Sequence, residues 1–120
     1  MSFTFLKQLP TPEEIKQEYA LSPQAARTKL ERDQMVQDII TGKSSKFLVI
    51  IGPCSADNED SVCDYISRLR SVQEKVADHI VIVPRIYTNK PRTTGEGYKG
   101  IAHQPDPEKG TDFLKGIIAM

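Results

Sequence analysis

A short stretch, residues 85–101, gathers cationic and hydroxyl side chains among three glycines. The side chains with chemical potential are Arg85, Lys90, Arg92, Thr93, Thr94 and Lys99. Arginine offers a phosphate a rigid fork of N–H donors, and lysine offers a compact positive charge. Glycine lets backbone N–H groups come close to the oxygens of an anion. The stretch is therefore a candidate site for phosphorylated anions, and a solvated basic surface loop is the alternative.

Two apolar runs, Phe47–Ile51 and 80–83, predict the strands that would position these side chains. Neither run alternates with polar residues, which is typical of strands covered on both faces in a parallel sheet. Between them, apolar residues at spacings of three and four predict a helix over 59–76. Strand, helix and strand form a β-α-β unit. Cys54 and Arg85, which follow the two strands, then share the edge of the sheet where α/β proteins bind ligands.

The same segments carry a family resemblance. Gly-Pro-Cys-Ser at 52–55, followed by Arg-Ile-Tyr-Thr-Asn-Lys-Pro-Arg-Thr-Thr at 85–94, resembles type I 3-deoxy-D-arabino-heptulosonate 7-phosphate (DAHP) synthase. The resemblance runs from about residue 20 to the C-terminus, and it is specific because both motifs occur in order on one β-α-β unit. It implies a (β/α)8 barrel enzyme that condenses phosphoenolpyruvate with erythrose 4-phosphate, the first step of the shikimate pathway to aromatic amino acids.

The resemblance also implies roles for single residues. Cys54 would be one ligand of a divalent transition metal, which would act as a Lewis acid on the aldehyde oxygen. Arg85 and Lys90 would hold phosphoenolpyruvate, and Arg92 with Thr93 would hold the phosphate of erythrose 4-phosphate. The chemistry implied needs no organic cofactor, and the resemblance implies a homo-oligomer in the full-length enzyme.

Two departures from the family pattern lie beside these residues. Pro84 stands where many members have methionine, and Gly-Glu-Gly-Tyr at 95–98 is one residue longer than a common form. Neither departure changes a residue with an implied role.

The fold class expected is α/β, an N-terminal helical extension followed by the first β-α-β unit of a (β/α)8 TIM barrel, truncated. Residues 1–45 are the predicted extension, and residues 46–120 are the predicted start of the barrel. A complete barrel of this kind takes about 250 residues. The 120 residues of the chain are therefore expected to correspond to an amino-terminal third of the enzyme.

Capping signals predict where the remaining helices begin. Thr11 opens a capping box with proline at the first helical position, which predicts a short helix through about Tyr19. Ser22 begins a second helix that is expected to stop at Gly42. Thr111 is the predicted N-cap of the last helix.

Composition narrows the possible partners and location. Lys+Arg and Asp+Glu both number 16, so there is no net charge that would favour nucleic acid or an anionic membrane. No apolar run approaches the roughly 18 residues of a membrane span, and no secretory signal is apparent at the start. Two cysteines, Cys54 and Cys63, are too few for a disulfide framework and are expected to be reduced. We expect a cytoplasmic protein.

Three functions stay open. The first is DAHP synthase, seen through part of its chain. The second is a catalytically inactive fragment that binds anions weakly or associates with full-length subunits. This second reading is favoured for the isolated chain, because one cysteine is an incomplete metal site. A doubly wound phosphate-binding protein ranks last, since no GxGxxG or GxxxxGK(S/T) signature is recognised after either strand. Three acidic residues could bind a hard cation but are better explained by a helix dipole, namely Asp57, Glu59 and Asp60.

Overall fold

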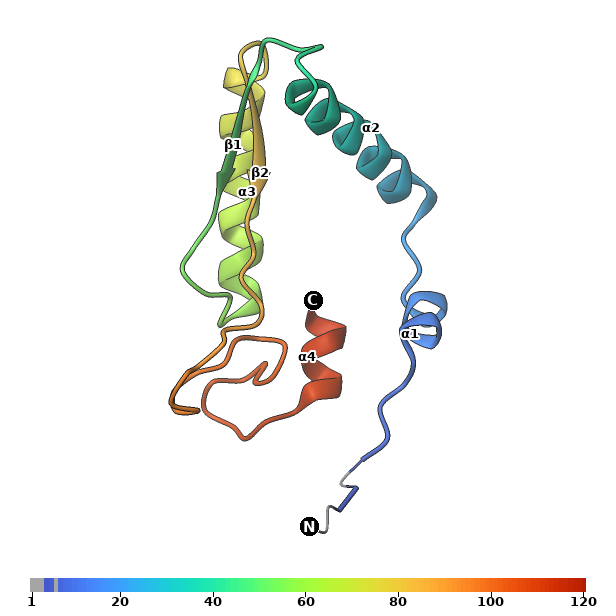
Figure 1. Cartoon of the computed structure of the whole chain (residues 1–120), viewed down its shortest axis with the longest axis vertical. Helices are drawn as coiled ribbons and strands as arrows, with labels where there is room; N and C mark the ends of the chain where they lie inside the picture. Colours follow the sequence, from blue (N-terminus) through green and yellow to red (C-terminus); the bar gives the residue numbers. More distant parts are fainter. Residues whose placement is uncertain (1–3, 6) are drawn as a thin grey trace.

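The computed structural model describes residues 4, 5 and 7–120, and the described part contains four helices and two strands. They are α1 (Pro12–Glu18), α2 (Pro23–Ile40), β1 (Phe47–Ile51), α3 (Glu59–Val76), β2 (Ile80–Pro84) and α4 (Phe113–Ala119). Figure 1 shows β1 and β2 alongside α3, with α1 and α2 forming a separate arm and α4 near the long loop after β2. The Cα radius of gyration is 17.7 Å, against about 14 Å for a compact chain of this length, so the molecule is open.

The β-α-β unit has the predicted parallel arrangement. Phe47 pairs with Ile80 and Ile51 pairs with Pro84, with the crossover helix α3 between the strands in sequence. The helix packs against β2, where Val81 is only 1% exposed. Strand β1 and helix α3 have the predicted bounds, and β2 extends one residue further than predicted, to Pro84.

The helices of the N-terminal arm begin at the predicted caps. Thr11 Oγ1 accepts a hydrogen bond from the Glu14 N–H at 3.3 Å, and Glu14 Oε2 accepts one from the Thr11 N–H at 2.7 Å, which completes the capping box. Ser22 caps α2, and Gly42 follows that helix at φ +75°, a left-handed conformation that favours glycine. Within the described residues, none of the helices combines the length and apolarity that crossing a membrane requires.

The predicted start of the last helix was wrong by one residue. The N-cap of α4 is Asp112, whose Oδ1 accepts a hydrogen bond from the Lys115 N–H at 3.2 Å, and not Thr111. Both residue types cap helices well, but a carboxylate also interacts favourably with the positive end of the helix dipole. The division between residues 1–45 and 46–120 stays a prediction.

The sheet is less covered than the apolar strands predicted. Phe47 is 74% exposed and Ile50 is 63% exposed, and these two side chains lie on opposite faces of β1. The physical reason is that α3 packs mainly on β2, while α2 contacts β1 without covering it. The chain as described therefore leaves apolar strand surface open on both faces.

One buried polar side chain, that of Gln73, occupies part of the outer edge of β2. Gln73 of α3 is 9% exposed. Its Nε2 donates a hydrogen bond to Ile80 O at 2.8 Å, and its Oε1 accepts one from the Ile82 N–H at 2.6 Å. The Phe47 N–H donates to His79 O, so alternate residues of β2 face β1 and the groups bonded to Gln73 lie on the opposite edge. A side-chain amide thus pairs with the strand as a neighbouring backbone would.

We expect the 120-residue chain, expressed alone, to self-associate. Exposed apolar strand surface and an unpaired β1 edge favour contacts between copies, and two strands are too few to close a barrel. Size-exclusion chromatography with light scattering should show oligomers or aggregates, and thermal melting should lack a single cooperative transition. A soluble monomer that melts cooperatively would contradict this expectation.

Candidate active site

The segments that follow β1 and β2 are held together by backbone hydrogen bonds. The Ala56 N–H donates to Tyr87 O at 3.0 Å, and the Ile101 N–H donates to Ala56 O at 3.1 Å. The Ala102 N–H donates to Thr88 O at 3.0 Å, so the second segment folds back on itself. Ala56 is 1% exposed. The loop after β1 is therefore fixed between the outgoing and returning parts of the loop after β2.

Two glycines permit this close packing. A Cβ atom on Gly52 would lie 1.8 Å from Arg85 O, and one on Gly100 would lie 2.2 Å from Thr88 O. Gly100 also has φ +99°, a conformation that other residues rarely adopt. Gly52 thus brings the ends of the two strands together, and Gly100 allows the loop to return against itself.

Cys54, Arg85 and Lys90, which sequence reasoning placed at one edge of the sheet, come together in the structure. Lys90 Nζ lies 3.1 Å from Cys54 Sγ, and Arg85 Nη2 donates to Pro53 O at 2.6 Å. Both cations also face the ring of Tyr87, at 5.2 Å for Arg85 Cζ and 5.7 Å for Lys90 Nζ. The ring supports the two positive charges by cation–π attraction, and sequence reasoning gave Tyr87 no role although it lies between them in the motif.

The positive charges around Cys54 favour its thiolate. The hydrogen bond from Lys90 and then the charge of Lys90 lower the pKa of the Cys54 thiol, with smaller contributions from Arg85 and Arg92. Cys54 is exposed. A thiolate is the form of cysteine that binds metal ions, and it suits borderline and transition metals.

The described residues do not build a complete metal site. No group of three or more His, Cys, Asp or Glu side chains in the described part of the chain is arranged to hold a metal ion. Cys54 offers one donor, whereas protein metal sites of this type use three or four. The donor chemistry at Cys54 fits one position of a transition-metal site, and the remaining positions are not supplied by the residues described.

Arg92 is held on the far part of the same loop. Its Nε donates to Tyr98 O at 2.9 Å, and no other described residue bonds to its guanidinium. The two terminal nitrogens are thus left to donate hydrogen bonds to two oxygens of an anion. Thr93 lies in the turn that the Gly95 N–H closes on Arg92 O at 3.0 Å, so it stays beside Arg92, and no hydrogen bond joins these two described residues, Thr93 and Cys54.

Other polar residues near the site have structural partners. His103 Nε2 lies 3.0 Å from Asn89 Oδ1, and its ring meets Phe113 of α4 edge-on at 4.8 Å between centroids. His103 therefore connects the loop to α4. Glu59 and Asp60 occupy the first turn of α3, as the helix-dipole explanation predicted, whereas Asp57 precedes the N-cap Asn58 and lies outside the helix.

The expectation that no GxGxxG sequence follows either strand was wrong as to the letters, because residues 95–100, after β2, are GEGYKG. The structure places this stretch in turns of the long loop, and the segment that follows it is not a helix. The strand–turn–helix geometry that a dinucleotide fingerprint requires is therefore missing here. This result agrees with the low rank given to a doubly wound nucleotide-binding fold.

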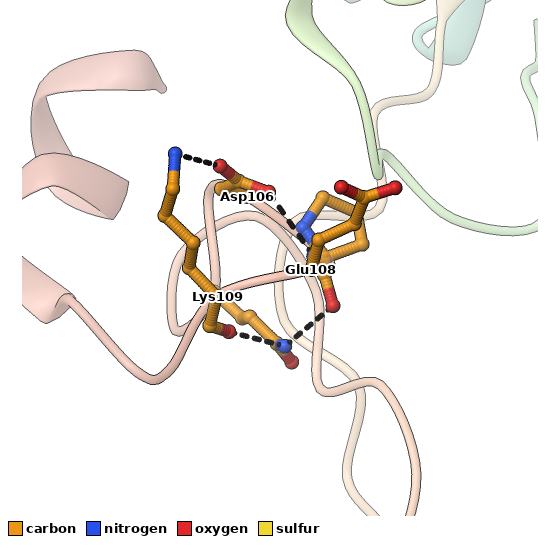
Figure 2. A network of polar contacts seen from close by, with 5 residues as sticks. Asp106, Glu108 and Lys109 are labelled. Carbon is orange, nitrogen blue, oxygen red and sulfur yellow. Dashed lines mark hydrogen bonds and ion pairs between the residues drawn. The ribbon is translucent and has the colours of Figure 1, made fainter.

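A compact polar turn leads from the loop to α4. Figure 2 shows Asp106, Glu108 and Lys109 at its centre. Asp106 Oδ1 accepts a hydrogen bond from the Glu108 N–H at 3.0 Å, and Asp106 Oδ2 lies 2.6 Å from Lys109 Nζ. Gln104 Nε2 donates to Pro107 O at 3.0 Å and to Lys109 O at 2.8 Å. The ion pair is exposed and contributes little alone, so the turn is held mainly by its amide and backbone contacts.

A cysteine and two cationic side chains after adjacent parallel strands define an α/β protein whose candidate anion site lies at the carboxyl edge of its sheet. The chain belongs to the DAHP synthetase I family, which matches residues 15–115. Curated relatives include the phenylalanine-inhibited phospho-2-dehydro-3-deoxyheptonate aldolase of Saccharomyces cerevisiae, 32% identical, and the Tyr-sensitive enzyme of Escherichia coli, 33% identical, each over 109 residues. These alignments cover 91% of this chain and 29% and 30% of the relatives.

A solved structure gives the same result for the fold. Phospho-2-dehydro-3-deoxyheptonate aldolase from Francisella tularensis matches with a TM-score of 0.87 at 28% identity, over 98% of this chain and 35% of that one. The chain therefore spans about a third of the length of these relatives and corresponds to an amino-terminal portion of the family fold. The expected fold class, helices followed by the first parallel β-α-β unit, is confirmed.

Proposed function

We propose that this chain supplies substrate-binding residues and one metal ligand to a DAHP synthase, which condenses phosphoenolpyruvate with erythrose 4-phosphate to DAHP and phosphate. The observation that carries the proposal is the 3.1 Å contact between Lys90 Nζ and Cys54 Sγ, with Arg85 tied to Pro53 beside it. Family membership over residues 15–115 supports the same reading.

The proposed roles follow from charge and position. Arg85 and Lys90 neutralise and orient the carboxylate and phosphate of phosphoenolpyruvate, because they converge at the strand ends over one aromatic ring. Arg92 and Thr93, further along the loop, hold the phosphate of erythrose 4-phosphate. Both proposed anion sites lie on one loop that is held by backbone hydrogen bonds, so they fix the distance between the two substrates. Such positioning supplies a large part of the reduction of the activation barrier in many enzymes. Cys54 is proposed as one ligand of a divalent transition metal.

The same observations favour a more limited role for the 120 residues acting alone. One metal donor and an open sheet leave the described chain without a complete site. The isolated chain is then inactive and binds anions weakly or associates with full-length subunits. In the complete enzyme we propose a cytoplasmic homo-oligomer.

A hybrid enzyme tests the proposal. Residues 15–115 of this chain would replace the corresponding segment of the Haemophilus influenzae phospho-2-dehydro-3-deoxyheptonate aldolase, which is 37% identical over 98 residues. We expect the hybrid to consume both substrates and the 120-residue chain alone to show no turnover. Titration of the folded hybrid with phosphoenolpyruvate by calorimetry gives a second measurement that does not depend on turnover. A folded hybrid that shows neither turnover nor phosphoenolpyruvate binding would reject the proposal.

Gly52 should be intolerant of a side chain in the same hybrid. Gly52→Ala places a Cβ atom 1.8 Å from the backbone oxygen of Arg85, so the strand ends must separate. We expect a loss of about 1–3 kcal/mol in the free energy of unfolding, measured by urea denaturation. Gly110→Ala is the matched control, because a Cβ there meets nothing within 4 Å, and its effect should stay within about 0.5 kcal/mol. Equal stabilities of the two variants would contradict the role given to Gly52.

A further inference from the structure

Tyr98 connects the two parts of the candidate site, the Arg92 segment through its backbone oxygen and the Cys54 loop through its phenol oxygen. Its backbone oxygen accepts the hydrogen bond from Arg92 Nε at 2.9 Å. Its phenol oxygen lies 3.1 Å from Ala56 O and 3.0 Å from Gln104 O. Ala56 comes two residues after Cys54, in the loop that follows β1. One half-buried residue thus joins the Arg92 segment to the Cys54 segment.

The phenol is well suited to this role. It has one O–H to donate, and both carbonyls lie within hydrogen-bond distance, so the donor is satisfied by either loop. Burial, and to a smaller extent the negative charge of Asp57, raises the pKa of the Tyr98 phenol above its ordinary value. The group therefore stays a protonated donor at neutral pH. No ion pair or side-chain hydrogen bond among the described residues holds Arg92 in another way.

We propose that Tyr98 is a positioning residue, which fixes the Arg92 guanidinium relative to the Cys54 loop so that Arg92 can bind a phosphate. Tyr98 acts through Arg92 and touches no reacting atom. The identity of that phosphate as the one on erythrose 4-phosphate rests on the proposed function, whereas the positioning of Arg92 for a phosphate does not. The longer Gly-Glu-Gly-Tyr sequence at 95–98 supplies the turns, with Gly95 at φ +75° and Gly97 at φ +84°, that bring residue 98 back to Arg92.

The first experiment measures binding of inorganic phosphate to the hybrid enzyme and its variants, because the isolated chain is expected to self-associate. Tyr98→Phe removes only the phenol oxygen, and we expect phosphate to bind about three- to tenfold more weakly, the usual effect of losing one neutral hydrogen bond. In an Arg92→Ala background the same change should have no further effect, because the two residues act as one unit. Tyr65→Phe, which removes a hydroxyl from α3, is the control and should bind phosphate as the parent does.

Three results would overturn the inference. They are parent-like phosphate binding by Tyr98→Phe, an equal weakening in the presence and absence of Arg92, and no phosphate binding by the folded parent hybrid. Far-UV circular dichroism of each variant shows whether weaker binding reflects general unfolding. If Tyr98→Phe unfolded the protein, it would also weaken phosphate binding further in the Arg92→Ala background.

Kinetics of the hybrid separate this inference from the proposed function. Tyr98→Phe should raise the KM for erythrose 4-phosphate by about three- to tenfold and leave the KM for phosphoenolpyruvate unchanged. A folded hybrid that is inactive and binds no phosphoenolpyruvate, but gives the expected phosphate results, would reject the synthase role and retain the positioning role of Tyr98. An active hybrid whose KM values do not change with Tyr98→Phe would support the synthase role and reject the positioning role of Tyr98.

Discussion

Replacing Cys54 by alanine in the hybrid enzyme is expected to abolish DAHP formation and metal retention together. Cys54 is exposed on a loop after β1, and Lys90, Arg85 and Arg92 favour the thiolate that a metal would bind. Losing one protein ligand from a site of three or four removes most of its affinity for a transition metal. The fold should change little, because the side chain contributes nothing to the buried core. Metal content by mass spectrometry and turnover are the two measurements.

Cys63 provides the control for this experiment. It is also a free, exposed cysteine, but it lies in α3 away from the loop cations. Cys63→Ala should keep both metal and activity, and chelation of the parent should reproduce the Cys54→Ala result. If Cys54→Ala retained full activity, or if the parent worked after its metal was removed, Cys54 would have no role as a ligand.

Separate alanine substitutions of Arg85 and Arg92 are expected to affect different substrates. Arg85→Ala should raise the KM for phosphoenolpyruvate, because Arg85 lies at the strand end beside Lys90 and Pro53. Arg92→Ala should raise the KM for erythrose 4-phosphate, because Arg92 is held further along the loop. Loss of a charge-assisted contact corresponds to a change of roughly ten- to a hundredfold. Steady-state kinetics with each substrate varied in turn measure both effects.

Arg68→Ala is the matched control for the loss of one arginine. Arg68 lies on α3, where its Nε is 2.9 Å from Asp64 Oδ2 in an exposed pair that contributes little to stability. Both KM values should stay at the parent level in this variant. Equal increases in both KM values for Arg85→Ala and for Arg92→Ala would show that the two arginines do not serve separate substrates.

The fold of this chain could be predicted largely because its signals are local. Continuous apolar runs specified β1 and nearly all of β2, and the spacing of apolar residues specified α3 to the residue. The error at Thr111 arose because two good capping residues, Thr111 and Asp112, are adjacent, and only the hydrogen bond to Lys115 decides between them.

The site could be predicted only as far as strand order constrains it. Parallel strands require Cys54 and Arg85 to share an edge, and the structure adds the contact of Cys54 with Lys90. The role of Tyr98 depends on loop residues far apart in sequence meeting in space, and no short-range pattern encodes that meeting. The roles assigned to Arg85, Lys90, Arg92, Thr93 and Cys54 in binding substrates and metal stay predictions.

The Gln73 amide makes the two edges of the sheet chemically unequal. On the edge of β2 that faces away from β1, Gln73 occupies both the Ile80 carbonyl and the Ile82 N–H, and Pro84 has no N–H to offer. An incoming strand needs alternating donors and acceptors, and on this edge only the Ile80 N–H is left to donate. The outer edge of β1 has no such protection, since Leu48 and Ile50 keep their backbone groups there. Copies of the chain that associate by strand addition should therefore pair β1 with β1. The product is a dimer whose two outer strands are both β2, with the edge that Gln73 occupies facing outward, and not a sheet that grows without limit.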